Sequence, residues 1–193
     1  MKKLLVHACC GPCFAYIQQD LKTNGLVNED GSYEKVDYTA LFYNPNIHPK
    51  VEHQRRIEAF KMLCDMTNCK YDILDEYDMH NFTIDIVKNV YLDKKYQKRC
   101  EICYLKRLQK VFEYAKENNF DIVTTTLTIS PYQNHEIIKE VGEKLSQEYG
   151  IEFRYIDYTP HFREGQKIAR DMGLYMQKYC GCIYSMDSGK WVY

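Results

Sequence analysis

The sequence predicts an α/β protein: a single domain with a mostly parallel, Rossmann-like sheet of about five strands and helices on both faces. Two observations predict it. Short apolar runs alternate with longer segments in which apolar residues recur at helical spacing. No repeat or low-complexity linker interrupts this alternation over the 193 residues, a length that can bury one good core. We therefore expect one domain covering residues 1–193.

Five short apolar runs are the expected strands, and longer helical segments between them favour parallel pairing. The strands are expected at Lys3 to His7, Tyr38 to Tyr43, Tyr71 to Leu74, Asp121 to Thr126 and Glu152 to Ile156. The helices are expected at Phe14 to Asn24, Val51 to Met66, a pair within Phe82 to Asn118, His135 to Tyr149 and Gln166 to Tyr179. The polar stretch at 28–32 is expected to be a surface turn inside the domain.

Composition bounds the class of protein. The N-terminus is basic, but its apolar run is too short for a signal peptide, and no later segment approaches the roughly 18 apolar residues that cross a bilayer. The formal net charge is −1. Nine cysteines in 193 residues are too few for a small disulfide-held scaffold. We expect a soluble, cytoplasmic protein whose thiols are kept reduced.

Seven of the nine cysteines fall into three tight clusters. These are Cys9-Cys10-Gly11-Pro12-Cys13, Cys100-Glu101-Ile102-Cys103 and Cys180-Gly181-Cys182. Grouped cysteines in a cytosolic chain more often bind metal or perform redox chemistry than form structural disulfides. Cys64 and Cys69 stand apart and are expected to be buried structural residues.

Three loops are expected to meet at the carboxyl edge of the sheet, where open α/β folds bind ligands. One carries the first cysteine cluster and follows the first strand. The others are Tyr43-Asn44-Pro45-Asn46-Ile47-His48-Pro49 after the second strand and the stretch from Thr124 to Tyr132 after the fourth.

The expected cofactor is an iron-sulfur cluster, and the preferred four thiolate ligands are Cys9, Cys10, Cys100 and Cys103. Cys100 and Cys103 are three residues apart in a helical segment, so both thiols project from one face. Spacing does not exclude Cys13 as a ligand. A structural zinc site with four cysteines is the alternative, although zinc more often uses two Cys-x-x-Cys pairs.

Cys180 and Cys182 are different, because one glycine separates them. A disulfide between them would close a small, strained ring, and strained disulfides have raised potentials. The pair therefore suits reversible two-electron storage, with a role as further metal ligands as the alternative.

Three other protein classes share part of this pattern. Cys10-Gly11-Pro12-Cys13 matches the thioredoxin dithiol, but only one strand precedes it and five other clustered cysteines would be left unexplained. An ATP-dependent tRNA thiolation enzyme would need a glycine- and serine-rich phosphate loop where residues 9–13 lie. A non-catalytic, zinc-bound RNA-binding module remains a third possibility.

The motifs together resemble the QueH family of epoxyqueuosine reductases. The residues that carry the resemblance are His7 to Cys13, Tyr43 to Pro49, Arg99 to Cys103, Thr125 to Leu127 with Ser130 to Tyr132, and Tyr179 to Cys182. They occur in the family's order over nearly the whole chain.

The resemblance implies a reaction. QueH proteins are cobalamin-independent enzymes that reduce the epoxide of epoxyqueuosine, at the wobble position of tRNA anticodons, in the last step of queuosine biosynthesis. It implies that Cys9, Cys10, Cys100 and Cys103 hold a 4Fe-4S cluster and that Cys180 and Cys182 form a redox-active disulfide. The electron donor is unknown.

Loss of the epoxide oxygen also needs an acid or Lewis acid. The candidates are His7, Tyr132, His135 and an additional mononuclear iron, for which Cys13 is a candidate ligand. A histidine such as these, or His48, more often has a hydrogen-bonded structural role.

Binding to tRNA is expected to use local positive charge, because the net charge is near zero. One group flanks the second cysteine cluster and consists of Lys94, Lys95, Lys98, Arg99, Lys106, Arg107 and Lys110. The second group is His53-Gln54-Arg55-Arg56. Tyr43 and Tyr132 are the expected stacking platforms for unpaired bases.

Overall fold

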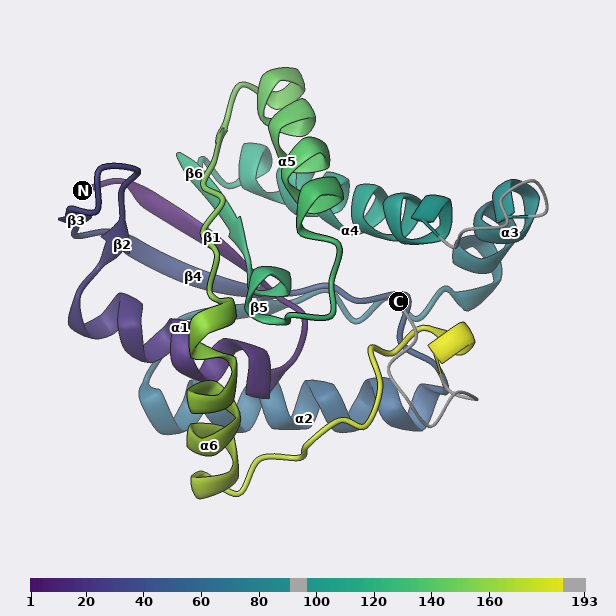
Figure 1. The fold of residues 1–193 in the computed structure, drawn as a ribbon, viewed down its shortest axis with the longest axis horizontal. Coiled ribbons are helices and arrows are strands. Elements are labelled where there is room, and N and C mark those ends of the chain that lie inside the picture. The colour runs from purple at the N-terminus through teal and green to yellow at the C-terminus, as the bar shows by residue number, and fades with distance from the viewer. Residues whose placement is uncertain (91–96, 186–193) are drawn as a thin grey trace.

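The computed structural model describes residues 1–90 and 97–185, and it confirms the expected Rossmann-like fold (Figure 1). Five parallel strands form one sheet in the order β5-β4-β1-β6-β7. The strands are β1 (Lys3–Ala8), β4 (Asp37–Phe42), β5 (Tyr71–Ile73), β6 (Ile122–Thr125) and β7 (Glu152–Phe153). All five expected strands are present, and β7 is shorter than expected because only its two residues pair with β6.

Strand β1 lies at the centre of the sheet. Every residue of β1 after Lys3 is buried, as expected for a parallel strand covered on both faces. The chain adds β4 and β5 on one side of β1 and then returns to add β6 and β7 on the other. The strand order therefore reverses between β1 and β6, and the loop after β1 opens into the crevice created there.

Helices cover both faces of the sheet (Figure 1). One face is covered by α1 (Gly11–Thr23), α2 (Lys50–Thr67) and α6 (Phe162–Asp171). The other is covered by α4 (Gln97–Glu117) and α5 (His135–Tyr149), and α3 (Met79–Val90) packs beside α4.

Alternate residues of β1 supply the two apolar cores. Leu4, Val6 and Ala8 belong to the core beneath α1 and α2, whereas Leu5 belongs to the core beneath α4 and α5. This alternation fixes the register of the strand, because a shift by one residue would exchange the two faces.

The last expected helix differs from the observed one. Helix α6 begins at Phe162, after the 3₁₀ turn Thr159–His161 (η2), and ends at Asp171 rather than at Tyr179. Gly173 follows with φ +72°, a conformation that ends the helix. Residues 173–182, here called the docked segment, then run along α2 without helical structure (Figure 1).

The polar stretch at 28–32 forms a turn, as expected. It joins two short antiparallel strands, β2 (Leu26–Val27) and β3 (Tyr33–Glu34), which the sequence pattern did not predict. Two further 3₁₀ turns, η1 (Thr126–Ile129) and η3 (Ile183–Ser185), lie near the sheet's carboxyl edge and the end of the described chain.

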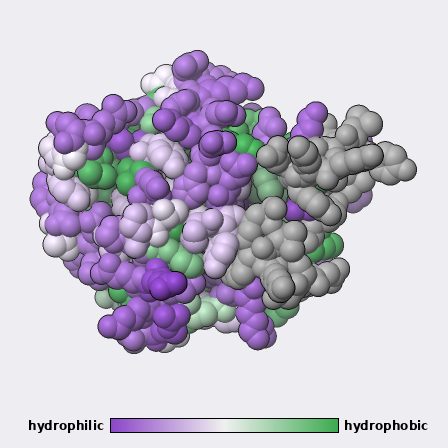
Figure 2. Space-filling model, viewed as in Figure 1, coloured by the Kyte–Doolittle hydropathy of each residue, from purple (hydrophilic) through white to green (hydrophobic). Residues whose placement is uncertain are grey.

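The described surface is mainly hydrophilic on the face shown in Figure 2, with hydrophobic residues in separate small patches. No helix within the described ranges is long and apolar enough to span a bilayer.

Candidate functional site: a cysteine-lined pocket

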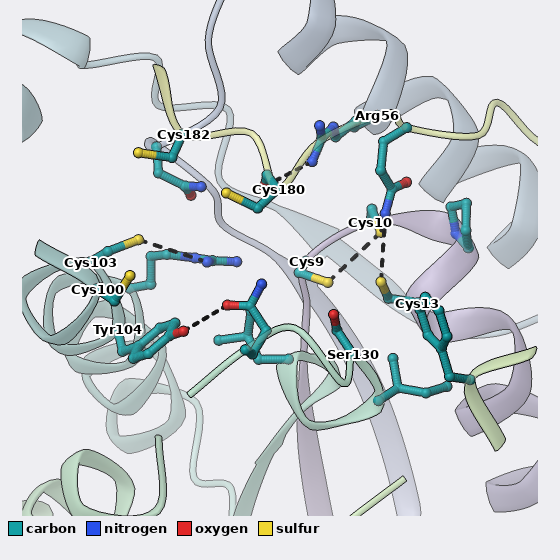
Figure 3. Close-up of a pocket in the computed structure, with 18 of the residues that line it drawn as sticks. Cys9, Cys10, Cys13, Arg56, Cys100, Cys103, Tyr104, Ser130, Cys180 and Cys182 are labelled. Carbon is teal, nitrogen blue, oxygen red and sulfur yellow. Dashed lines mark hydrogen bonds between the residues drawn. The ribbon is translucent and has the colours of Figure 1, made fainter. Parts of the chain in front are cut away.

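All seven clustered cysteines line one pocket at the carboxyl edge of the sheet (Figure 3). They are Cys9, Cys10, Cys13, Cys100, Cys103, Cys180 and Cys182. The pocket holds about 1010 Å³ of space, its open mouth included. Three segments that are far apart in the sequence thus supply thiols to a single cavity.

The first cysteine cluster is placed by the start of α1. Cys10 is the N-cap residue, with extended backbone, and Pro12 occupies the first turn, where its missing N–H has no cost. Gly11 is required there, since a Cβ would lie 2.8 Å from the carbonyl oxygen of Ala59 on α2. The sulfurs of Cys9, Cys10 and Cys13 consequently lie within 4.8 Å of one another.

These three thiols share hydrogen bonds. The Sγ atoms of Cys9 and Cys10 are 3.8 Å apart, and the hydroxyl of Thr126 donates to Cys9 Sγ at 3.2 Å. Hydrogen bonds from Cys10 and Cys13 lower the pKa of Cys9 well below its usual value. Burial raises the pKa of Cys10. Cys9 is therefore the member of this group that most readily becomes a thiolate, the form that binds metal.

Cys100 and Cys103 reach the pocket from α4, on the opposite side from α1 (Figure 3). Burial raises the pKa of Cys100 and raises that of Cys103 to about 11. Arg107, one turn further along α4, lies with its Nη1 4.0 Å from Cys103 Sγ. Its Nη2 donates to Asn44 Oδ1 at 2.5 Å, and Asn44 Nδ2 donates to the carbonyl of Ala8 at 2.9 Å.

Three buried arginines line the pocket among the thiols. They are Arg56, Arg99 and Arg107, with exposed fractions of 2%, 4% and 4%. Their burial excludes a solvated helix face for these three of the expected RNA contacts, and contact with RNA stays a prediction. His53 is also buried. A buried guanidinium needs a negatively charged partner, and thiolates in the pocket would supply one.

The donor set fits an iron-sulfur cluster. Thiolates are the usual ligands of such clusters, and the pocket offers more than the four thiols required. The buried guanidiniums would balance the negative charge of the thiolates, and hydrogen bonds to sulfur are available from Thr126 and Arg107.

Arg56 holds the Cys180-Gly181-Cys182 motif against α2. Its Nη1 donates to the carbonyl of Cys180 at 3.1 Å, and its Nη2 donates to the carbonyl of Tyr179 at 2.8 Å. The same guanidinium stacks over the Tyr179 ring, 5.2 Å from its centroid, and pairs through Nε with Glu52 at 2.8 Å. One buried side chain therefore fixes the backbone that carries the redox candidates.

The loop after β4 holds the same motif from the other side. The backbone N–H of His48 donates to the carbonyl of Gly181 at 2.9 Å, and the hydroxyl of Tyr179 donates to the carbonyl of His48. Gly181 has φ +107°, and a Cβ there would lie 2.9 Å from Ile47 Cγ1. Glycine is required between the two cysteines because both the conformation and the space exclude a side chain.

Cys180 and Cys182 are not joined to each other in a disulfide. A hydrogen bond from Cys182, followed by one from Ser185, lowers the pKa of Cys180 to about 6. The Ser185 hydroxyl lies 3.1 Å from Cys180 Sγ. Cys180 therefore has the property of an attacking or electron-donating thiolate near neutral pH.

His7 does not reach the pocket. Its Nε2 donates to the carbonyl of Tyr43 at 3.1 Å, so Nδ1 accepts from the hydroxyl of Thr125 at 2.8 Å. Burial, assisted by the charge of Arg107, lowers the pKa of His7 to about 3. This geometry favours a structural role over the donation of a proton to a substrate.

His135 is held in a similar way. Its Nε2 donates to the carbonyl of Ser130 and its Nδ1 contacts the hydroxyl of Tyr155, both at 2.9 Å. Tyr132 is 41% exposed beside the pocket, with its ring edge against Phe162, a pocket-lining residue. Of these two candidates, Tyr132 is the one that an incoming ligand could touch.

The remaining expected RNA contacts are scattered. Tyr43 lines a separate surface groove with Lys106 and Lys110, and burial raises its pKa to about 12. Lys98 is exposed at the start of α4. Lys94 and Lys95 lie outside the described residues.

Cys64 and Cys69 are buried in the core beneath α2, away from the pocket. Their placement agrees with the expected structural role. Sequence reasoning missed Arg56 and Gln177 as pocket residues. Glu52 precedes Arg56 by four residues, a spacing that allows an ion pair on one helix face. This spacing was the sequence signal that could have indicated a buried Arg56.

Comparisons with known proteins agree on one family. The family model described as epoxyqueuosine reductase QueH matches residues 4–188. A protein of that name from Dehalococcoides mccartyi is 32% identical over 183 residues, covering 95% of this chain and 92% of its own. Those from Acinetobacter baylyi and Thermotoga maritima are 32% and 30% identical, covering 98% and 96% of this chain and 83% and 91% of their own.

A solved structure shares the fold. It is the U34-tRNA thiolase NcsA from Methanococcus maripaludis with its [4Fe-4S] cluster, with a TM-score of 0.58 and 16% sequence identity. The match covers 97% of this chain and 62% of the thiolase, so this chain spans less than two thirds of that protein.

Proposed function

The chain belongs to the QueH family of epoxyqueuosine reductases, and from that membership we propose that its cysteine-lined pocket is where the epoxide of epoxyqueuosine in tRNA is reduced. The observation that carries this proposal is the convergence of all seven clustered cysteines on one pocket. We propose that residues 1–193 act as one α/β redox domain.

Cys9, Cys10, Cys100 and Cys103 are the proposed ligands of a 4Fe-4S cluster. In support, all four line the pocket, and of the first cluster Cys9 lies nearest to α4 in Figure 3. When bound, the cluster supplies single electrons and Lewis acidity. Cys13 would then be left as the thiol for an additional mononuclear iron, and its closeness to Cys9 and Cys10 supports this role.

Cys180 and Cys182 are the proposed two-electron reductant. Their oxidation to a disulfide releases two electrons and two protons. Removal of the epoxide oxygen consumes the same number, giving an alkene and water, so one dithiol and one epoxide balance. The lowered pKa of Cys180 and its fixed backbone support this role.

The proton for the leaving oxygen is proposed to come from a pocket thiol or from Tyr132. His7 and His135 are the less favoured candidates, because both ring nitrogens of each contact protein groups. The positive charges of the buried arginines are proposed to offset the negative charges of the thiolates that form in the pocket.

The substrate implied by the family is tRNA, and we propose that the anticodon loop enters beside Tyr132, where a base could stack. An electron donor must reduce the disulfide after each turnover, and its identity is open. Since tRNA is modified in the cytoplasm, we propose that location for the enzyme.

A single-turnover experiment tests this function. Anaerobically purified protein is reconstituted with iron and sulfide, reduced with dithionite, freed of reductant and mixed with tRNA containing epoxyqueuosine. Nucleoside analysis is expected to show conversion to queuosine by the wild type but not by Cys180→Ser. A protein that holds a reducible cluster and still forms no queuosine would refute the function. A colourless protein that binds zinc would indicate a structural metal site instead.

A further inference from the structure

Gln177 lies on the docked segment and lines the pocket. Its Nε2 donates to Cys10 Sγ at 2.9 Å and lies 3.6 Å from Cys13 Sγ. The contact with Cys10 joins residues 167 positions apart in the sequence, and the contact with Cys13 joins residues 164 apart. No expected site residue accounts for them.

The two ends of the carboxamide have different surroundings. A thiolate can only accept hydrogen bonds, so the NH₂ end must face sulfur whenever Cys10 is deprotonated. The oxygen then faces the other way. Gln177 Oε1 is buried and has no hydrogen-bond partner among the described residues. A buried acceptor of this kind costs free energy until a donor reaches it.

The backbone on both sides of Gln177 is fixed. The hydroxyl of Tyr175 donates to Glu52 at 2.6 Å, and Arg56 holds the carbonyl of Tyr179 at 2.8 Å. Both anchors belong to α2, which is packed in the core. The side chain of Gln177 is therefore held at the cysteines, and its free oxygen cannot turn out to solvent without losing the contact with Cys10.

We propose that Gln177 joins the metal-binding and substrate-binding parts of the site: its amide N–H groups donate to Cys10 and Cys13, and its oxygen accepts a hydrogen bond from a hydroxyl or amine of the bound nucleoside. The second half rests on the proposed function; the first half does not, since it concerns only the sulfur ligands. Occupation by substrate would supply the donor that Oε1 lacks.

The contact with sulfur has a measurable consequence. Reduction adds negative charge to the cluster and its thiolates, so a hydrogen-bond donor stabilises the reduced state more than the oxidised state. Removal of the donor should make the cluster harder to reduce.

The test uses reconstituted holoprotein and three substitutions. Gln177→Met removes both ends of the amide at similar length, and Gln177→Glu keeps an acceptor while it removes the donor. Gln166→Met is the matched control, because Gln166 also lines the pocket but has no hydrogen bond to sulfur among those described. Redox titration followed by electron paramagnetic resonance measures the cluster potential, and single-turnover assays over a range of tRNA concentrations measure apparent affinity and rate.

We expect Gln177→Met and Gln177→Glu to lower the equilibrium constant for cluster reduction about tenfold, which is about 59 mV for one electron. Gln166→Met should keep the wild-type potential. Gln177→Met should also weaken the apparent tRNA affinity, and Gln177→Glu should weaken it less. If a variant fails to fold, Gln177→Asn, whose amide is one methylene too short, should show the same lower potential.

A wild-type potential in Gln177→Met overturns the proposal, as does a shift of equal size in Gln166→Met. An unchanged apparent affinity in Gln177→Met overturns the substrate contact. If the wild-type holoprotein reduces no epoxyqueuosine, the proposed function fails, while the potentials still decide whether Gln177 acts on the cluster.

Discussion

The guanidinium of Arg56 donates to the carbonyl oxygen of Cys180 at 3.1 Å. Arg56 sits on the buried face of α2, and Cys180 lies 124 residues later in a segment with no helical or strand structure of its own. The position of a redox-active candidate thus depends on one ion-paired side chain of a core helix.

Arg56→Lys is expected to reduce single-turnover activity on the order of 10- to 100-fold. Lysine keeps the charge that pairs with Glu52, but its single ammonium cannot form the fork that holds two carbonyls. Lys61→Gln, on the exposed face of the same helix, is the control and should behave as the wild type. Full activity in Arg56→Lys would contradict this role.

Gly181→Ala is expected to release the docked segment from α2. The new methyl would meet Ile47 Cγ1 at 2.9 Å and Arg56 Nη1 at 3.1 Å, and φ of +107° adds about 1–3 kcal/mol of strain. Limited proteolysis should then cut the segment faster than in the wild type. Gly173→Ala shares a positive φ but has open space, so its effect should be smaller. Equal cleavage of the two variants would argue against the clash.

Cys180 is expected to react with iodoacetamide with a midpoint near pH 6, because its pKa is lowered to about 6. The thiolate predominates above that pH and is lost below it. Ser185→Ala should move the midpoint upward, since it removes a hydrogen bond to the sulfur. Peptide mapping by mass spectrometry separates Cys180 from the other cysteines. Ser130→Ala, which alters the pocket without touching Cys180, should leave the midpoint in place.

Replacement of a cluster ligand is expected to remove most of the iron and sulfide. Cys100→Ser and Cys103→Ser should give this result, whereas Cys64→Ser, whose thiol lies in the core, should keep the wild-type content. Cys13→Ser should keep the cluster. Since the sulfurs of Cys9, Cys10 and Cys13 lie within 4.8 Å of one another, loss of the cluster in Cys13→Ser would instead place Cys13 among the four ligands, in the position proposed for Cys9 or Cys10.

His7 is expected to make the protein less stable in acid. Its pKa is lowered to about 3 in the folded protein, so the unfolded chain binds the proton first, at about pH 6.5. Stability is therefore complete above that value and falls as pH decreases toward 3, by at most about 1.4 kcal/mol per pH unit. The free energy of unfolding by denaturant is measured between pH 7 and 4 for the wild type and for His7→Gln. The wild type should lose stability more steeply with falling pH than His7→Gln, and equal slopes for the two proteins would refute the prediction.

Sheet and helices were largely predictable because their apolar residues repeat locally. The helix from His135 to Tyr149 was predicted to the residue, and β1 differs by one residue. The rule that ligands bind at the carboxyl edge of parallel strands also brought the first cysteine cluster to the site.

The docked segment was not predictable in this way. Its apolar residues Leu174 and Met176 resemble a continuation of α6, yet they pack into the core beneath α2 because Glu52 and Arg56 hold Tyr175 and Tyr179. Such contacts between distant residues leave no periodic pattern. Because the sequence does not reveal such contacts, Arg56 was predicted to be part of a basic, RNA-binding group, although its side chain is buried.

The contact between Gln177 and Cys10 also orders events during synthesis. A ribosome that builds the chain from its N-terminus exposes Cys9, Cys10 and Cys13 long before Gln177 and Cys180 emerge. Until then these thiols have neither the amide that contacts them nor the segment that closes their pocket. A translation product cut short after α5 would therefore carry thiols that oxidation or stray metal ions could capture.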